Sequence, residues 1–165
     1  MIELVQLSLP ALEALAAGDL ARANAVSPVV LTPYMLERRS VWVRRAKQVA
    51  ADPACAPWVT GVVVDETLGV VGTAGFHEPP DAEGRVEIGY AIDPSHRRRG
   101  FARATVELLV ERAQCAPAVR TVRACISPTN AASRAVIAAW PFQHVGEVMD
   151  EEDGPEQVWE LAIRP

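Results

Sequence analysis

The stretch GRVEIGYAIDPSHRRRGFARATVELLVERA, residues 84–113, decides the fold. Its first part, residues 86–92, combines Val, Ile and Tyr with one Glu and one Gly, a composition typical of a β-strand. From Phe101 to Val110 the apolar residues instead recur at the period of a helix, with Glu and Arg between them. The sequence therefore predicts a strand that continues into a helix through the loop 95–100.

The loop between this strand and this helix is suited to binding an anion. The first amides of a helix lack internal partners, and the helix dipole adds partial positive charge there. Gly100 allows a backbone conformation closed to other residues, and Arg97, Arg98 and Arg99 add positive charge. We interpret the loop as a pyrophosphate cradle that lacks both the P-loop ending and the three-glycine dinucleotide motif. The alternative is a solvated, Arg-rich helix start.

The composition indicates one domain, residues 1–165, with one hydrophobic core. Half of the 165 residues are hydrophobic, and a chain of this length buries about two-thirds of its unfolded surface. The net charge is −5 and the basic residues form no long tract, so nucleic acid is not an expected partner. Three cysteines without metal-ligand spacing predict a reduced, cytoplasmic protein that binds no metal. No apolar stretch approaches membrane length, so no membrane association is expected.

Periodicity and turn residues predict the other elements. Strands are expected at 1–7, 58–64, 68–76, 119–126, 142–149 and 157–163, and helices at 10–18, 33–49 and 130–137. The acidic residues of the loop 77–83 and of the turn 150–154 would attract a cationic amine, unless they only solvate these turns.

At Arg97, Gly100 and Ala102 the chain resembles the GNAT superfamily of N-acetyltransferases, whose signature is Arg/Gln-x-x-Gly-x-Gly/Ala. The run from Glu87 to Tyr90 resembles the fourth strand of the branch that acetylates the N-termini of ribosomal proteins, and Asn130-x-x-Ser133 resembles the family's second cofactor motif. These motifs follow the family's order over more than half of the chain. The resemblance implies an α/β (α+β) fold with a mixed, mostly antiparallel sheet of six to seven strands. About four helices would flank this sheet, which would be splayed between strands 4 and 5.

The resemblance implies transfer of acetyl from acetyl-CoA to a primary amine by direct attack, the amine being a protein N-terminus or a small molecule. The amine must lose a proton before it attacks. Glu87 matches a strand carboxylate that acts as base in several family members; the alternative is a Glu paired with a neighbouring strand. The backbone N–H of Ala91 is expected to donate to the thioester carbonyl, and Gly89 to form a bulge that opens the sheet.

The family's cofactor site maps onto three segments of this chain. Acetyl-CoA is expected to contact Ile92, the loop residues Arg97, Arg98, Arg99, Gly100, Phe101 and Ala102, and Asn130 and Ser133 on the last helix. The alternative for the last two is a helix cap and a surface serine. Tyr34, His77 and Glu78 are expected to contact the acceptor, with core packing and solvation as alternatives.

One position departs from the family pattern. Many members carry a Tyr seven residues after the Asn to protonate the leaving thiolate, and here that position is Ile137. Either another group or water supplies this proton, or the thiolate leaves unassisted. The alternative function is therefore a non-catalytic module that binds or senses acyl-CoA. Dimers are frequent in the family, so a homodimer is among the expected assemblies.

Overall fold

The computed structural model describes residues 1–151 and 154–163. Within these residues, seven strands form one sheet and six α-helices pack around it. The strands are β1 (Ile2–Val5), β2 (Gly61–Asp65), β3 (Gly69–Phe76), β4 (Arg85–Ile92), β5 (Thr121–Ile126), β6 (Gln143–Asp150) and β7 (Gly154–Ala162). The helices are α1 (Leu9–Ala17), α2 (Leu20–Val26), α3 (Tyr34–Glu37), α4 (Arg39–Ala51), α5 (Phe101–Cys115) and α6 (Ala131–Ile137).

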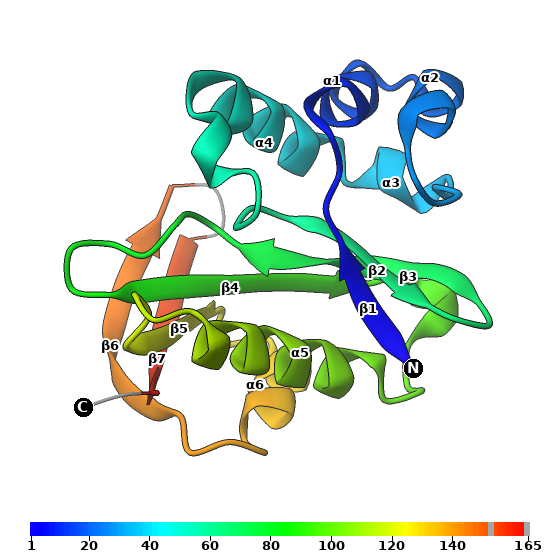
Figure 1. Cartoon of the computed structure of the whole chain (residues 1–165). Helices are drawn as coiled ribbons and strands as arrows, with labels where there is room; N and C mark the ends of the chain where they lie inside the picture. The colour runs from blue at the N-terminus through cyan, green and yellow to red at the C-terminus, as the bar shows by residue number, and fades with distance from the viewer. Residues whose placement is uncertain (152–153, 164–165) are drawn as a thin grey trace.

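Helices cover both faces of the sheet (Figure 1). Helices α1 to α4 lie over one face, and α5 and α6 lie under the other. Successive side chains of a strand point to opposite faces, so β2 sends Val62 into the core with Trp42 and Val63 into the core with Leu109. Strands β2 and β3 are mostly apolar along their whole length, as expected for strands that helices cover on both faces. No helix in the described part of the chain is both long and apolar enough to span a bilayer.

The sheet opens between β4 and β5. The strand order is β1-β2-β3-β4-β5-β7-β6, and every neighbouring pair is antiparallel except β4 with β5, which is parallel. The parallel pairing joins only residues 85–87 to residues 121–123. From residue 88 on, β4 pairs with β3 alone among the described strands, while β5 continues along β7. The mostly antiparallel, splayed sheet predicted from the sequence is confirmed.

The structure has six α-helices in the described residues, where about four were predicted. The helix expected over 33–49 divides at Arg38, whose backbone leaves the helical region (φ −98°, ψ 20°) between α3 and α4. Helix α2 was not predicted, although Asp19 caps it by accepting a hydrogen bond from the Arg22 N–H at 2.9 Å. Strand β7 begins at Gly154, three residues before its predicted start, and residues 152 and 153 of the predicted acidic turn lie outside the described residues.

Candidate functional site

Two cavities meet where β4 and β5 separate. The first, the α5 cavity, has a volume of about 580 Å³ and lies between the loop before α5 and helix α6. The second, the α4 cavity, has a volume of about 530 Å³ and is lined by residues of α4, β3, β4, β5 and the β6–β7 hairpin. Tyr90, Asn130 and Ser133 line both cavities. The two cavities therefore adjoin each other at the splay.

The α5 cavity gathers most of the residues that the sequence predicted as a cradle. Arg98 and Gly100 have left-handed backbones (φ 60° and 85°), which turn the loop into the first turn of α5. The Arg97 Nε donates to the carbonyl of Ile92 at 3.1 Å and so ties the loop back to the end of β4. The predicted residues that line this cavity are Ile92, Arg97, Arg98, Gly100, Phe101, Ala102, Asn130 and Ser133.

Arg99 is the one cradle residue that the structure does not place on this cavity. Arg103, in the first turn of α5, lines the cavity instead. The signal for Arg103 was its place in the first helical turn after the loop, once α5 is known to begin at Phe101. Asn130 also has a structural role, because its side chain accepts a hydrogen bond from the Ser133 N–H at 3.0 Å and caps α6.

The register of β4 determines which of its backbone groups face the gap. In an antiparallel pair, positions that bond to the partner strand alternate with positions that face away from it. The His77 N–H donates to the Glu87 carbonyl at 2.8 Å, and the Asp93 N–H donates to the Val71 carbonyl at 3.0 Å. The register between these ends is continuous. Gly89 and Ala91 are therefore bonded to β3, and Glu87 is bonded to His77, the residue after that strand.

This register corrects two predictions. Ala91 lies opposite Thr73, so its N–H faces β3, and the N–H groups that face the gap are those of Ile88, Tyr90 and Ile92. Gly89 forms no bulge, since the pairing with β3 runs without a shift past it. The predicted N–H of Ala91 therefore does not face the gap, and the N–H of Tyr90, one residue before it, lies at the centre of the open edge.

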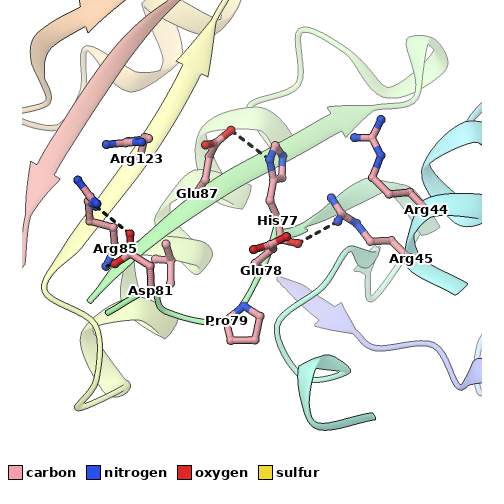
Figure 2. Close-up of a pocket in the computed structure, with 10 residues that line it drawn as sticks. Arg44, Arg45, His77, Glu78, Pro79, Asp81, Arg85, Glu87 and Arg123 are labelled. Atoms are coloured by element: carbon pink, nitrogen blue, oxygen red, sulfur yellow. Dashed lines mark hydrogen bonds and ion pairs between the residues drawn. The ribbon is translucent and has the colours of Figure 1, made fainter. Parts of the chain in front are cut away.

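Glu87 and His77 meet on the α4 side of the sheet, and Figure 2 shows their contact. The His77 Nδ1 lies 3.1 Å from the Glu87 Oε1. Burial alone would raise the pKa of Glu87, but the hydrogen bond and charge of His77, with smaller effects of Cys125 and Arg123, lower this pKa below its usual value. Burial and the adjacent Glu87 carboxylate raise the pKa of the Cys125 thiol to about 12. Near pH 7 the site therefore holds an ionised carboxylate beside a neutral thiol.

Tyr90 supplies a phenol where the two cavities meet. Its hydroxyl is buried; the Ser133 hydroxyl lies close to it, but no hydrogen bond of good geometry forms with Ser133 or another described residue. Burial raises the pKa of Tyr90, and the nearby Ser133 hydroxyl opposes this effect in part. Ile137 packs into the core at 2% exposure. Helix α6 thus lacks the Tyr that many family members carry there, but β4 has a Tyr, Tyr90, next to the gap.

The residues predicted to contact an acceptor do not all lie together. His77 and Glu78 line a third cavity of about 360 Å³, the loop cavity, which shares Arg44, His77 and Glu87 with the α4 cavity. Tyr34 is instead buried at 8% exposure in the core beneath the helical layer.

Two of the predicted acidic residues are engaged by the chain itself. Asp81 and Glu83 each accept from Arg85 at 2.9 Å. The sequence also gave no role to Cys125, whose place beside Glu87 follows from the alternation of β5: Arg123 lies opposite Glu87, and Cys125 is two residues on. The described residues contain no group of three or more His, Cys, Asp and Glu side chains that could hold a metal ion.

Comparison with known families decides the assignment. The family model for the acetyltransferase (GNAT) domain matches residues 2–143. The chain belongs to the GNAT acetyltransferase family. This GNAT chain is 32% identical over 91 residues to the uncharacterized N-acetyltransferase p20 of Bacillus licheniformis, a match that covers 55% of the chain and 51% of the relative. The chain thus spans about half the length of the curated relatives it matches.

Solved structures share the fold along nearly the whole chain. A spermidine N-acetyltransferase SpeG chimera from Vibrio cholerae and hSSAT has a TM-score of 0.67 at 16% identity and covers 98% of this GNAT chain and 95% of its own. RimJ from Mycobacterium smegmatis, solved in complex with CoA-disulfide, has a TM-score of 0.67 at 18% identity, with coverages of 98% and 81%. At these identities the likeness shows the fold alone, and it confirms the predicted one.

Proposed function

We propose that this GNAT domain transfers an acetyl group from acetyl-CoA to a primary amine. The observation that carries the proposal is the passage through the splayed sheet, where the α5 cavity meets the α4 cavity that contains Glu87. A bound thioester and an acceptor amine approach from opposite faces in this arrangement. The same passage keeps the acceptor away from the cradle loop.

The residues around the α5 cavity fit coenzyme A. The left-handed backbones of Arg98 and Gly100 open the loop at the start of the 15-residue helix α5, where amides and helix dipole favour a pyrophosphate. The open edge of β4 offers N–H and carbonyl groups to an extended, amide-bearing arm such as pantetheine, in the manner of an added strand. RimJ, which shares this fold, was solved with a coenzyme A derivative.

The chain's residues divide the chemistry between the two sides of β4. When bound, acetyl-CoA supplies a thioester that an amine can attack. The Glu87–His77 pair takes the proton that the amine loses. The N–H of Tyr90 donates to the carbonyl oxygen as negative charge develops there, a role first expected of Ala91. The Tyr90 hydroxyl donates to the sulfur that leaves, so the substitution at Ile137 does not remove the proton donor.

We infer that the acceptor is a polar amine, either a small molecule or a protein N-terminus. Carboxylates and guanidinium groups both line the α4 cavity: Glu87, Asp150 and Glu156 on one hand, and Arg38 and Arg44 on the other. The carboxylates favour a cationic amine, and the guanidinium groups favour an acceptor with a polar or anionic part elsewhere. The SpeG neighbour is described as acting on spermidine, and it supports an amine acceptor in general.

Release of free thiol tests the proposal. The chain is incubated with acetyl-CoA and a panel containing a polyamine, an amino-acid amide and peptides with free N-termini. We expect turnover with at least one acceptor, and a loss of about 100-fold in Glu87→Gln with coenzyme A binding retained. Calorimetric binding of acetyl-CoA without thiol release would instead support the non-catalytic module. Absence of any coenzyme A binding would reject both.

A further inference from the structure

We propose that His77 is the general base of this site and that Glu87 acts through it as the orienting carboxylate. The inference rests on the proposed acetyl transfer and assigns a role within it. The His77 Nδ1 is the ring nitrogen that faces Glu87, at 3.1 Å from Oε1 (Figure 2). An ionised carboxylate accepts a hydrogen bond, so the neutral ring carries its proton on Nδ1 and keeps the lone pair of Nε2 free.

The free nitrogen lies over β4 at the edge of the α4 cavity. A Cβ placed on Gly89 would lie 2.7 Å from the His77 Nε2, closer than real Cβ contacts allow. Gly89 and His77 both line the α4 cavity, where an acceptor amine would sit. The ring therefore approaches Gly89 edge-on through Nε2, and the absence of a side chain at Gly89 leaves the room for it, one residue before the backbone donor at Tyr90.

The backbone of His77 is held from three directions. Its N–H donates to the Glu87 carbonyl at 2.8 Å, and its carbonyl accepts from the Arg45 Nη1 at 2.9 Å and from the Gln48 Nε2 at 3.0 Å. Arg45 is only 5% exposed and also donates to the Thr60 hydroxyl at 3.2 Å. Burial of this cation is unfavourable and lowers its pKa. A buried guanidinium and an amide that converge on one loop carbonyl fix the position of the imidazole.

The chemistry favours the imidazole over the carboxylate as the proton acceptor. Glu87 has a lowered pKa, so it is a weak base, whereas an imidazole is the side chain best suited to proton transfer near neutral pH. In the step, the amine nitrogen bonds to the acetyl carbon, the carbon–sulfur bond breaks, and the thiolate leaves with the electron pair. The surplus proton of the nitrogen goes to the His77 Nε2, and Glu87 stays ionised and stabilises the imidazolium.

Charged groups of both signs surround the ring. On β4 and β5 they are Glu87, Arg85 and Arg123; on α4 they are Arg44 and Arg45; on the loop after β3 they are Glu78 and Asp81. On the α4 cavity side the groups are Arg38, Cys125, Asp150 and Glu156. Of these groups, Glu87 makes the hydrogen-bonded contact with the imidazole.

His77→Gln tests the assignment in the full chain, with kcat/KM measured against pH for the acceptor that the thiol assay identifies. We expect a loss of about 100-fold in kcat and loss of the acidic limb of the profile, with the Kd of coenzyme A unchanged. His144→Gln is the matched control. His144 lies on β6, outside the three cavities, and its ring packs against Trp159 of β7. This control is expected to keep both the rate and the profile.

A second variant moves the ring without removing it. Gly89→Ala places a methyl group against Nε2, and we expect kcat to fall at least tenfold while coenzyme A still binds. A kcat of His77→Gln within threefold of the wild-type value, with the acidic limb of the pH profile intact, would overturn the role of His77. Full activity in Gly89→Ala would overturn it as well. Failure of the proposed function looks different, because the wild-type chain itself would then release no thiol.

Discussion

Tyr90 carries two functions of the proposed site on one residue. Its backbone N–H faces the gap, and its buried hydroxyl lies close to Ser133 but makes no hydrogen bond of good geometry with the described residues. An unpaired buried hydroxyl is unfavourable unless a ligand completes it. The leaving sulfur of a thioester is such a ligand, because it gains negative charge as the bond breaks.

Tyr90→Phe removes the hydroxyl and keeps the ring and the backbone donor. We expect kcat to fall about 10-fold to 100-fold, since a hydrogen bond to a charged group contributes about 1.5–3 kcal/mol. The measurement is steady-state thiol release, with coenzyme A affinity and thermal unfolding recorded in parallel. An unchanged kcat would show that the thiolate leaves without Tyr90, and a lost affinity would show a role in binding.

At the residue scale, the sequence predicted many of the groups that line the cavities, but it could not give the direction of their backbone groups. The loop from Arg97 to Ala102 was predicted from its charge, its glycine and its place before a helix, whereas Glu87 and His77 came from the family resemblance. The N–H of Ala91 faces β3 and not the gap, because the direction of a strand's N–H groups depends on its partner strand. Gly89 was misinterpreted for a related reason, since the ring that fills the space above it comes from another segment.

At the scale of elements, the loop before α5 depends on a left-handed glycine. Gly100 has φ 85°, and an ideal Cβ there would find no atom within 4 Å. Gly100→Ala therefore acts on the backbone alone, and we expect a loss of about 1–2 kcal/mol in the free energy of unfolding. Urea denaturation measures this loss.

Gly146→Ala is the matched control for that prediction. Its Cβ position is equally empty, but its φ is outside the left-handed range, so its effect is expected to stay within about 0.5 kcal/mol. Equal losses in the two variants would contradict the assignment of the effect to backbone strain.

The elements themselves were predictable where a periodic pattern is long. Helix α5 and strands β2 to β5 show such patterns, and their predicted ends are within a few residues of the observed ones. Helix α2 buries only Ala23, so it has no apolar stripe to detect. The break at Arg38 is a change of backbone angle between two helical segments, and a periodicity that continues across it gives no sign of the break.

At the scale of the whole molecule, several carboxylates link stability to pH. The folded pKa values of Asp65, Asp81 and Asp93 are lowered chiefly by hydrogen bonds to their side-chain oxygens, and that of Glu87 is lowered mainly by His77 against the effect of burial. A carboxylate with a depressed folded pKa stabilises the fold above its unfolded value of about 4, and this contribution disappears as the pH falls through the folded pKa.

The urea midpoint is therefore expected to fall on acidification from pH 5 to pH 3. Glu87→Gln should show a smaller fall than wild type, because it lacks one of these carboxylates. A midpoint that stays constant or rises over this range would contradict the linkage.

Within the described residues, β4 and β5 join the two halves of the sheet through three residue pairs, residues 85–87 with 121–123. A ligand that lies along the open edge of β4 would bridge them and stabilise the chain as a whole. At a concentration of 100 Kd, coenzyme A is expected to raise the free energy of unfolding by about 2.7 kcal/mol.

Hydrogen exchange gives the sharper test, because the amides of Tyr90 and Ile92 face the gap while those of Gly89 and Ala91 bond to β3. We expect coenzyme A to slow exchange most at the gap-facing amides. Equal slowing at both sets would indicate general stabilisation without occupancy of the splay, and the proposed path of the ligand would be wrong.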